Sequence, residues 1–198
     1  MKKTKQLFII LNLFLLMAMP GFLLSQENYS LSFDGEDDYG EINTASSNLV
    51  SDLSHTIEVW YKNPGVDGPG GDSQNTLIFS NYKAGSYNKT DLSIEGSGDE
   101  NSGKAYFNPT GADNLYSLNR IDDDQWHHIA GVYDTGNMQV RLYVDGIEQG
   151  VGNINQQLNL GNDNTFMLGS GDRVFANDRW MECEIYSARI SNNIRYTS

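Results

Sequence analysis

The sequence predicts an all-β protein, a sandwich or barrel of short antiparallel strands in one domain. Short apolar or alternating runs rich in β-branched and aromatic residues recur along the chain, and Gly, Asn, Asp and Ser separate them. No window has the apolar spacing and the caps of an amphipathic helix, and Ser46–Ser54 has room for one short turn at most. Strands resume directly after the loose stretches Asn63–Asn75 and Gly96–Gly103, so we expect these to be surface loops rather than domain linkers.

The expected strands follow from this pattern in chain order. They are Tyr29–Phe33, Tyr39–Ile42, Thr56–Lys62, Thr76–Tyr82, Thr90–Glu95, Lys104–Phe107, His127–Asp134, Gln139–Val144, Thr165–Leu168 and Met181–Tyr186.

Two turns predict that neighbouring strands form hairpins. Asp145-Gly146 lies between Arg141–Val144 and Ile147–Gln149, and both turn residues tolerate a positive φ. Thr135-Gly136-Asn137 makes a similar turn after the strand that ends at Asp134.

Alternation within the strands predicts which side chains share a face. Ile57, Val59 and Tyr61 alternate with Glu58 and Trp60, so one face is apolar and the other carries a large ring beside a carboxylate. Ile129 and Val132 fall on opposite faces, which predicts a central strand covered on both sides. We expect these side chains to be largely buried: Trp60, Ile129, Val132, Leu142 and Val144.

Charge and cysteine content exclude several classes of function. The 26 acidic residues outnumber the 13 Lys and Arg, which gives a formal net charge of −13. A nucleic-acid-binding protein needs a positive surface, so we expect no nucleic-acid partner, and the charge instead favours cations such as calcium. The one cysteine, Cys183, excludes an internal disulfide framework and a cysteine-rich zinc site.

The first 25 residues have the order of a secretory signal peptide. Three lysines precede an apolar run, and a Pro-Gly pair and a short segment ending at Ser25 lead into polar sequence. We therefore expect cleavage after Ser25, with residues 26–198 as the single domain and no membrane insertion after cleavage. An uncleaved anchor is the alternative, because Leu7–Leu24 is almost long enough to span a bilayer. The expected location is secreted, periplasmic or on the cell surface.

Four blocks in order resemble the laminin-G-like domains of the concanavalin A-like lectin/glucanase superfamily. Residues 32–39 (SFDGEDDY) and 56–62 (TIEVWYK) are similar to the two opening motifs of that family. Residues 126–134 (WHHIAGVYD) with 142–146 (LYVDG), and residues 182–186 (ECEIY), are similar to its central hairpin and its closing strand. The resemblance spans residues 29–196 and implies a jelly roll of two antiparallel sheets.

The same superfamily includes glycoside hydrolases, so catalysis by a pair of carboxylates has to be considered. Glu36, Asp38 and Glu41 match the letters of the E-x-D-x-x-E signature of those enzymes. The residues between them are polar or small instead of apolar, and solvated acids there would stay ionised and donate no proton near neutral pH. Adjacent strand residues point to opposite faces, so His127 and His128 are not expected to grip one metal ion. We assign no catalytic residue.

The resemblance also implies a structural calcium ion where the first and last strands meet. Asp34 and Glu182 lie in the two matching segments and are the candidate metal ligands. Calcium takes six to eight oxygens, so two carboxylates with carbonyls and waters would suffice. A second alignment of the closing segment, through Arg189–Asn192, would displace Glu182, and a turn aspartate with an exposed strand glutamate needs no metal.

Sugar binding would use aromatic faces together with Asn and Asp side chains. Two loop segments, around Lys83–Lys89 and Asn108–Tyr116, have this composition. The candidate ligand-binding residues are Tyr82, Tyr87, Asn88, Asn114 and Tyr116.

Three functions remain open at this point. The first is a secreted, non-catalytic module that binds carbohydrate or a glycosylated surface, and the second is an adhesion domain that binds protein. The third is a glycan-cleaving enzyme, either a hydrolase or a lyase. Aromatic side chains exposed in a groove would favour the first, a flat loop rim would favour the second, and two facing carboxyls in a cleft would favour the third.

Overall fold

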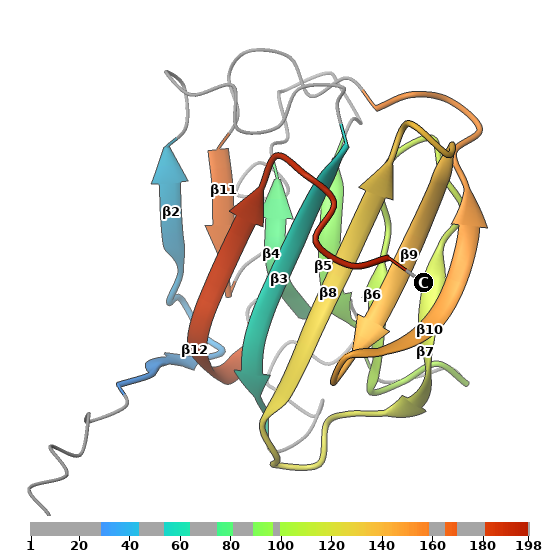
Figure 1. Cartoon of the computed structure of the whole chain (residues 1–198). Coiled ribbons are helices and arrows are strands. Elements are labelled where there is room, and N and C mark those ends of the chain that lie inside the picture. Colours follow the sequence, from blue (N-terminus) through green and yellow to red (C-terminus); the bar gives the residue numbers. More distant parts are fainter. Residues whose placement is uncertain are drawn as a thin grey trace, which may run out of the picture.

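The computed structural model describes residues 29–43, 54–63, 75–80, 89–96, 100–158, 165–169 and 181–197. These residues form two six-stranded antiparallel sheets that lie face to face (Figure 1). Sheet A has the order β1-β12-β3-β8-β9-β10, and sheet B has the order β2-β11-β4-β5-β6-β7. The strands are β1 (Leu31–Asp34), β2 (Gly40–Asn43), β3 (His55–Lys62), β4 (Asn75–Ser80), β5 (Thr90–Ile94), β6 (Lys104–Phe107), β7 (Leu115–Arg120), β8 (His127–Asp134), β9 (Gln139–Val144), β10 (Ile147–Asn153), β11 (Thr165–Leu168) and β12 (Glu182–Ser191). The predicted all-β jelly roll of two antiparallel sheets is confirmed.

The core fills the space between the two sheets. Ile57, Val59 and Tyr61 on β3 point inward, as their alternation predicts, and all three are buried. Sheet B approaches closely at Gly131 of β8, where a Cβ atom would lie 2.4 Å from the Phe107 ring. A side chain at position 131 would therefore push the two sheets apart.

The predicted core residues are buried with one exception. Ile129, Val132, Leu142 and Val144 are all buried. Ile129 belongs to the central core, whereas Val132 belongs to a second apolar cluster, so β8 is covered on both faces as predicted. Burial of Trp60 was a wrong prediction, because 41% of this residue is exposed. Its strand position puts the ring on the outer face of sheet A, the face turned away from sheet B, and none of the residues that the structure describes covers the sheet completely there.

The C-terminal tail, residues 192–197, explains the second apolar cluster. Ile194 and Tyr196 of this tail pack against Ala130, Val132 and Tyr143 on the outer face of sheet A. Figure 1 shows the tail leaving β12 and crossing over β3, β8 and β9 near one end of the sheet. The tail thus covers one part of the outer face.

Besides small shifts at strand ends, the observed elements differ from the predicted ones in three places. β10 runs to Asn153, beyond the Ile147–Gln149 expected from the hairpin. β7 was not predicted, because its LYSLNR sequence has no clear alternation of apolar and polar side chains, and half of its residues are exposed in the structure. β12 runs on to Ser191, well beyond the predicted end at Tyr186, with a register irregularity between Ile185 and Ser187. The predicted Asp145-Gly146 turn is confirmed, because both residues have a positive φ, 51° at Asp145 and 77° at Gly146.

The described residues contain no helix. Among them there is accordingly no helix that is long and apolar enough to cross a membrane. The predicted signal peptide, residues 1–25, lies outside the described residues.

Candidate functional site

A hollow of about 250 Å³ opens on the outer face of sheet A, between the centre of the sheet and the C-terminal tail. β3, β8 and β12 bring their outward side chains together here, because Glu58 pairs with Arg189 and Trp60 pairs with His128 in the strand register. We call this hollow the Trp60 pocket. Its lining includes Glu58, Trp60, His128, Arg189, Arg195 and Tyr196.

Glu58 is the buried charge at the base of the Trp60 pocket, with only 6% of the residue exposed. Its Oε1 lies 2.8 Å from Nε of Arg195 and 3.6 Å from a terminal nitrogen of Arg189, yet no hydrogen-bond donor is aimed at this oxygen. Its Oε2 lies 3.3 Å from Nε2 of His128 and accepts a hydrogen bond from the Tyr196 hydroxyl. A buried carboxylate needs partners of this kind, so Glu58 holds two arginines, a histidine and a tyrosine around one point.

The tail reaches the pocket because the backbone of the tail is fixed to β3. The Thr56 hydroxyl donates to the carbonyl of Asn193 at 2.9 Å and accepts from the N–H of Arg195 at 3.2 Å. These bonds bring Arg195 and Tyr196 over Glu58, which lies 138 positions before Tyr196 in the sequence. The tail therefore completes the pocket.

Aromatic rings form a connected row along this part of the sheet. The ring centroids of Trp60 and His128 are 5.3 Å apart, those of His128 and Tyr196 are 5.9 Å apart, and those of Tyr196 and Tyr143 are 5.4 Å apart. These separations are typical of interacting aromatic pairs. The neighbours of Trp60 thereby hold its ring in place while part of the ring stays open to solvent.

A second hollow, of about 490 Å³, lies on the same face where β1, β12 and β3 end. We call it the acidic hollow, because five carboxylates and one lysine contribute to its lining. These are Asp34, Glu36, Asp124, Glu182, Glu184 and Lys62.

Lys62 and Ser30 organise part of the acidic hollow. Hydrogen bonds to Asp124 and Glu184, each at an N–O distance of 3.4 Å, raise the pKa of Lys62. The Ser30 hydroxyl donates to Glu184 at 2.7 Å and, with Lys62 nearby, holds the pKa of that carboxyl below its ordinary value. One lysine cannot neutralise five acids, so the hollow remains negative.

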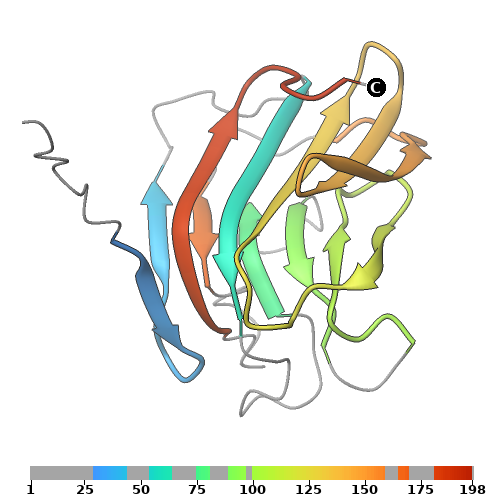
Figure 2. The same cartoon turned by 60° about the horizontal axis from the view of Figure 1, so that its bottom comes forward.

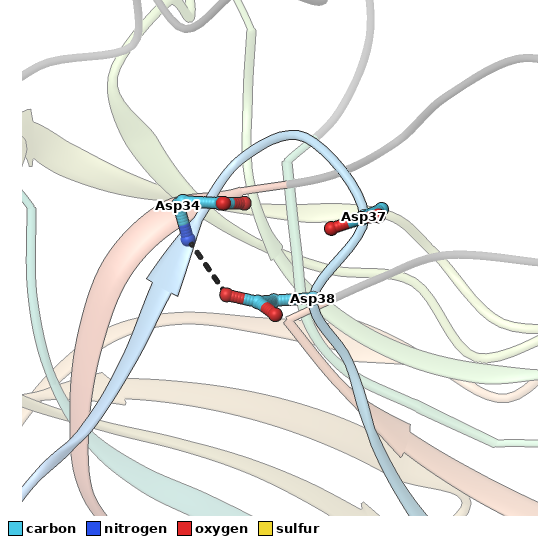
Figure 3. A group of neighbouring side chains, drawn as sticks. All are labelled: Asp34, Asp37 and Asp38. Carbon is cyan, nitrogen blue, oxygen red and sulfur yellow. Dashed lines mark hydrogen bonds between the residues drawn. The ribbon is translucent and has the colours of Figure 1, made fainter.

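The two candidate calcium ligands lie opposite each other across the β1–β12 pair. Asp34 is the register partner of Glu182, and both are exposed. Asp37 and Asp38 follow in the turn after β1, and one carboxylate oxygen from each of Asp34, Asp37 and Asp38 lies within 4.8 Å of the others (Figure 3). The Asp38 carboxylate also accepts a hydrogen bond from the backbone of Asp34. These carboxylates are hard oxygen donors of the kind that calcium prefers, and carbonyls and waters would have to complete its six to eight ligands, so the residues present fit a calcium ion.

Of the predicted loop residues, the two that the structure describes, Asn114 and Tyr116, line neither hollow. Tyr82, Tyr87 and Asn88 lie outside the described residues. Asn114 is exposed just before β7, and Tyr116 lies within β7, where its ring stacks on Tyr106 of β6 with centroids 4.6 Å apart. Tyr116 therefore belongs to a strand of sheet B instead of the predicted loop, and its role in ligand binding stays a prediction.

The Trp60 pocket itself was missed by the sequence analysis. Glu58 and Trp60 were expected on one face, but nothing near them in the sequence signals Arg189, Arg195 or Tyr196. The one available hint was the presence of two arginines six positions apart in a chain that has few cations. The predicted separation of the two histidines is confirmed, since His127 bonds to Asp123 and Asp145 while His128 lies beside Glu58.

Comparison with known proteins identifies the family. A family model described as the concanavalin A-like lectin/glucanases superfamily matches residues 34–195, and the search of curated proteins gives no match. Domains LG4-5 of the mouse laminin α1 chain are similar in structure, with a TM-score of 0.63, 11% identity and coverage of 89% of this chain but only 47% of the laminin chain.

Two carbohydrate complexes also have similar folds. The CBM40 module of a Ruminococcus gnavus sialidase, bound to α2,3-sialyllactose, has a TM-score of 0.61 and 14% identity, and the match covers 85% of this chain and 93% of the module. Domain 4 of an extracellular arabinanase from Geobacillus stearothermophilus, in complex with arabinotriose, has a TM-score of 0.55 and 17% identity, and the match covers 84% and 71% of the two chains. At these identities the likeness establishes the fold.

Proposed function

This chain belongs to the concanavalin A-like lectin/glucanase superfamily, and from that premise we propose that it is a secreted, non-catalytic module that binds carbohydrate in the Trp60 pocket. The observation that carries the proposal is a partly exposed tryptophan ring set beside fixed polar groups in one hollow. Sugars are recognised in this way, with an aromatic face against C–H groups and polar side chains on the hydroxyls. The small size of the hollow suits a single sugar unit at the end or edge of a glycan.

A glycan array probed with the purified protein tests this proposal. We expect binding by the unmodified chain and at least a tenfold loss in Trp60→Ala, because the substitution removes the ring against which a sugar packs. Trp126→Ala is the matched control, since Trp126 has the same type of side chain, lies outside the pocket and is equally exposed at 40%. An array without signal, or an equal loss in both variants, would refute the Trp60 pocket as a sugar site.

The absence of catalysis is part of the proposal. Glu36, Asp38 and Glu41, which match the hydrolase signature in letters, are all exposed around the β1–β2 turn, whereas the general acid of a glycoside hydrolase lies in a desolvated site. In the described part of the chain, Glu58 is the one carboxylate that lines the Trp60 pocket, whereas glycoside hydrolysis uses two. We expect no release of reducing sugar from any glycan that the protein binds, and measurable turnover would contradict the proposal.

We also propose that calcium binds at the β1–β2 turn through Asp34, with Asp37, Asp38 and Glu182 nearby. The turn stands at the edge of the sandwich (Figure 2), and Asp34, Asp37 and Asp38 are exposed. An ion that binds only the folded chain stabilises it by about 2.7 kcal/mol at a hundredfold excess over Kd. We therefore expect millimolar calcium to raise the melting temperature by several degrees.

Two controls make the calcium experiment decisive. Asp34→Ala should remove most of the gain, and magnesium at the same concentration should stabilise less, because it demands a tighter octahedral geometry. Equal shifts with calcium, magnesium and a simple salt would mean charge screening, and the site would then be rejected.

Secretion is proposed from the composition of residues 1–25. Mass spectrometry of protein recovered from outside the producing cells should give a chain that begins at Gln26. Recovery of the whole chain in the membrane fraction would favour the uncleaved anchor instead.

A further inference from the structure

Within the proposed function, on which this inference rests, we propose that the Trp60 pocket selects sugars that carry a carboxylate. The relevant ligands are glycans with a uronic acid or a sialic acid unit. The argument depends on the charges around the pocket, on the hydrogen-bonding capacity of the lining side chains, and on the position of the tryptophan ring relative to the arginines.

The Trp60 pocket is positively charged, although the chain as a whole is negatively charged. The chain as a whole carries a formal net charge of −13, yet Arg189 and Arg195 meet at the pocket around a single carboxylate, Glu58. One carboxylate neutralises one of the two guanidinium groups, so the pocket keeps a positive charge even when His128 is neutral. A local cationic site in an acidic protein attracts an anionic group of the ligand, whereas the acidic surface around the site repels it.

Glu58 orients the two arginines unequally. Arg195 lies 2.8 Å from the buried Oε1 atom of Glu58, which makes it the inner partner. Arg189 is farther away at 3.6 Å, and 57% of its side chain is exposed. Arg189 therefore presents its guanidinium to the solvent side of the pocket, where an incoming carboxylate can accept two parallel N–H bonds from it.

The lining side chains offer mainly donors. A guanidinium has five N–H donors and no acceptor. Glu58, the one carboxylate among the described lining residues, is buried at the base of the pocket and paired with the arginines Arg195 and Arg189. A neutral sugar hydroxyl needs an acceptor as well as a donor to be fully satisfied, whereas a carboxylate only accepts. The pocket is thus better matched to an anionic sugar than to a neutral one.

The ring of Trp60 and the arginines lie at adjacent register positions. Trp60 pairs with Ser187 on β12, and Glu58 pairs with Arg189 two positions farther along that strand. A sugar ring that packs on Trp60 therefore has its substituents beside Arg189. The Trp60 ring can stack on any sugar, and Arg189 beside it favours a sugar that carries a negative charge.

Isothermal titration with matched pairs of saccharides tests the inference. Sialyllactose is compared with lactose, and an oligouronate is compared with its methyl ester, using protein purified from expression of the full chain. We expect the acidic member of at least one pair to bind about tenfold more tightly, or more, than its neutral counterpart. The two pairs distinguish a sialic acid from a uronic acid as the source of the carboxylate.

Arg189→Gln should bring the affinity for the acidic sugar down to that of the neutral one, while Arg189→Lys should retain part of the preference. Arg120→Gln is the matched control, because Arg120 is equally exposed at 59% and also pairs with a buried carboxylate, Asp122, but belongs to sheet B. Equal affinity for acidic and neutral sugars would overturn the inference and leave the proposed function standing. An equal loss in Arg189→Gln and Arg120→Gln would overturn it too, and failure to bind any saccharide would refute both.

Discussion

The Trp60 pocket and the acidic hollow lie on the same face of sheet A, and their charges are arranged in opposite ways. In the Trp60 pocket one buried carboxylate is surrounded by two arginines, a histidine and a tyrosine. In the acidic hollow one lysine is surrounded by carboxylates that are largely exposed. The tail packs over one side of the Trp60 pocket, whereas most of the acidic side chains of the acidic hollow are exposed.

This difference in burial decides how much each interaction stabilises the fold. A charge that is kept from water needs its partners, and the removal of one partner leaves a desolvated ion behind. A charge at the surface is hydrated whether or not its partner is present, so a surface ion pair contributes little. The Trp60 pocket should therefore be rigid and sensitive to substitution, while the acidic hollow should tolerate substitution and respond mainly to added cations.

Removal of one cation from each region should give the largest contrast. Arg195→Met leaves the Glu58 carboxylate buried without its nearest positive partner, which should cost about 2–3 kcal/mol in the free energy of unfolding. Lys62→Met removes the lysine of the acidic hollow, and we expect no measurable loss. Urea denaturation of both variants provides the measurement. Similar losses of stability in the two variants would show that the difference in burial does not make the Trp60 pocket more sensitive to substitution than the acidic hollow.

A smaller contrast should follow from the removal of one hydroxyl from each region. Tyr196→Phe keeps the ring packing but removes the hydrogen bond to buried Glu58, at an expected cost of about 1–2 kcal/mol. Ser30→Ala removes a bond of the same kind to the more exposed Glu184, and the change should stay within about 0.5 kcal/mol. Thermal denaturation monitored by circular dichroism can resolve the two. A larger effect from Ser30 would contradict the comparison.

Local sequence patterns predicted the features that depend on neighbouring residues. Strand alternation placed Glu58 and Trp60 on one face, and the Asp-Gly pair at 145–146 predicted a tight turn that the structure contains. The opposition of Asp34 and Glu182 was suggested by the resemblance to a family rather than by any local pattern.

The remaining features depend on contacts between distant parts of the chain. The exposure of Trp60 depends on whether another layer covers that face, which alternation along β3 does not specify. Arg195 and Tyr196 reach Glu58 only because Thr56 holds the tail, across 137 positions in the sequence for the bond to Asn193. β7 was missed because its residues are half exposed, so that its alternation of apolar and polar side chains is weak.

A third charge cluster has the opposite arrangement to the Trp60 pocket, with a cationic group between two carboxylates. We expect it to give the smallest effect. His127 at the start of β8 lies between two carboxylates, with Nδ1 2.8 Å from Asp145 and Nε2 3.0 Å from Asp123. Burial of the ring opposes its charge, but the hydrogen bonds to Asp145 and Asp123 outweigh that cost and raise the pKa of His127 above 6.5. The same pairing lowers the pKa of Asp123, so both groups are charged in weakly acidic solution.

The raised pKa of His127 gives the expected pH dependence its sign. The stabilisation is fully present below the unfolded-state pKa of the histidine, about 6.5, and is lost as the pH rises through the higher folded-state pKa. His127→Gln should therefore destabilise the protein more at pH 5.5 than at pH 8.5, and the difference should be about 0.5 kcal/mol because the two carboxylates are half exposed. Denaturation at the two pH values measures it, with Asp123→Asn as a control that should weaken the pH dependence. An equal loss at both pH values would mean that the neutral imidazole makes the same contribution, and that charge is important at Glu58 but not here.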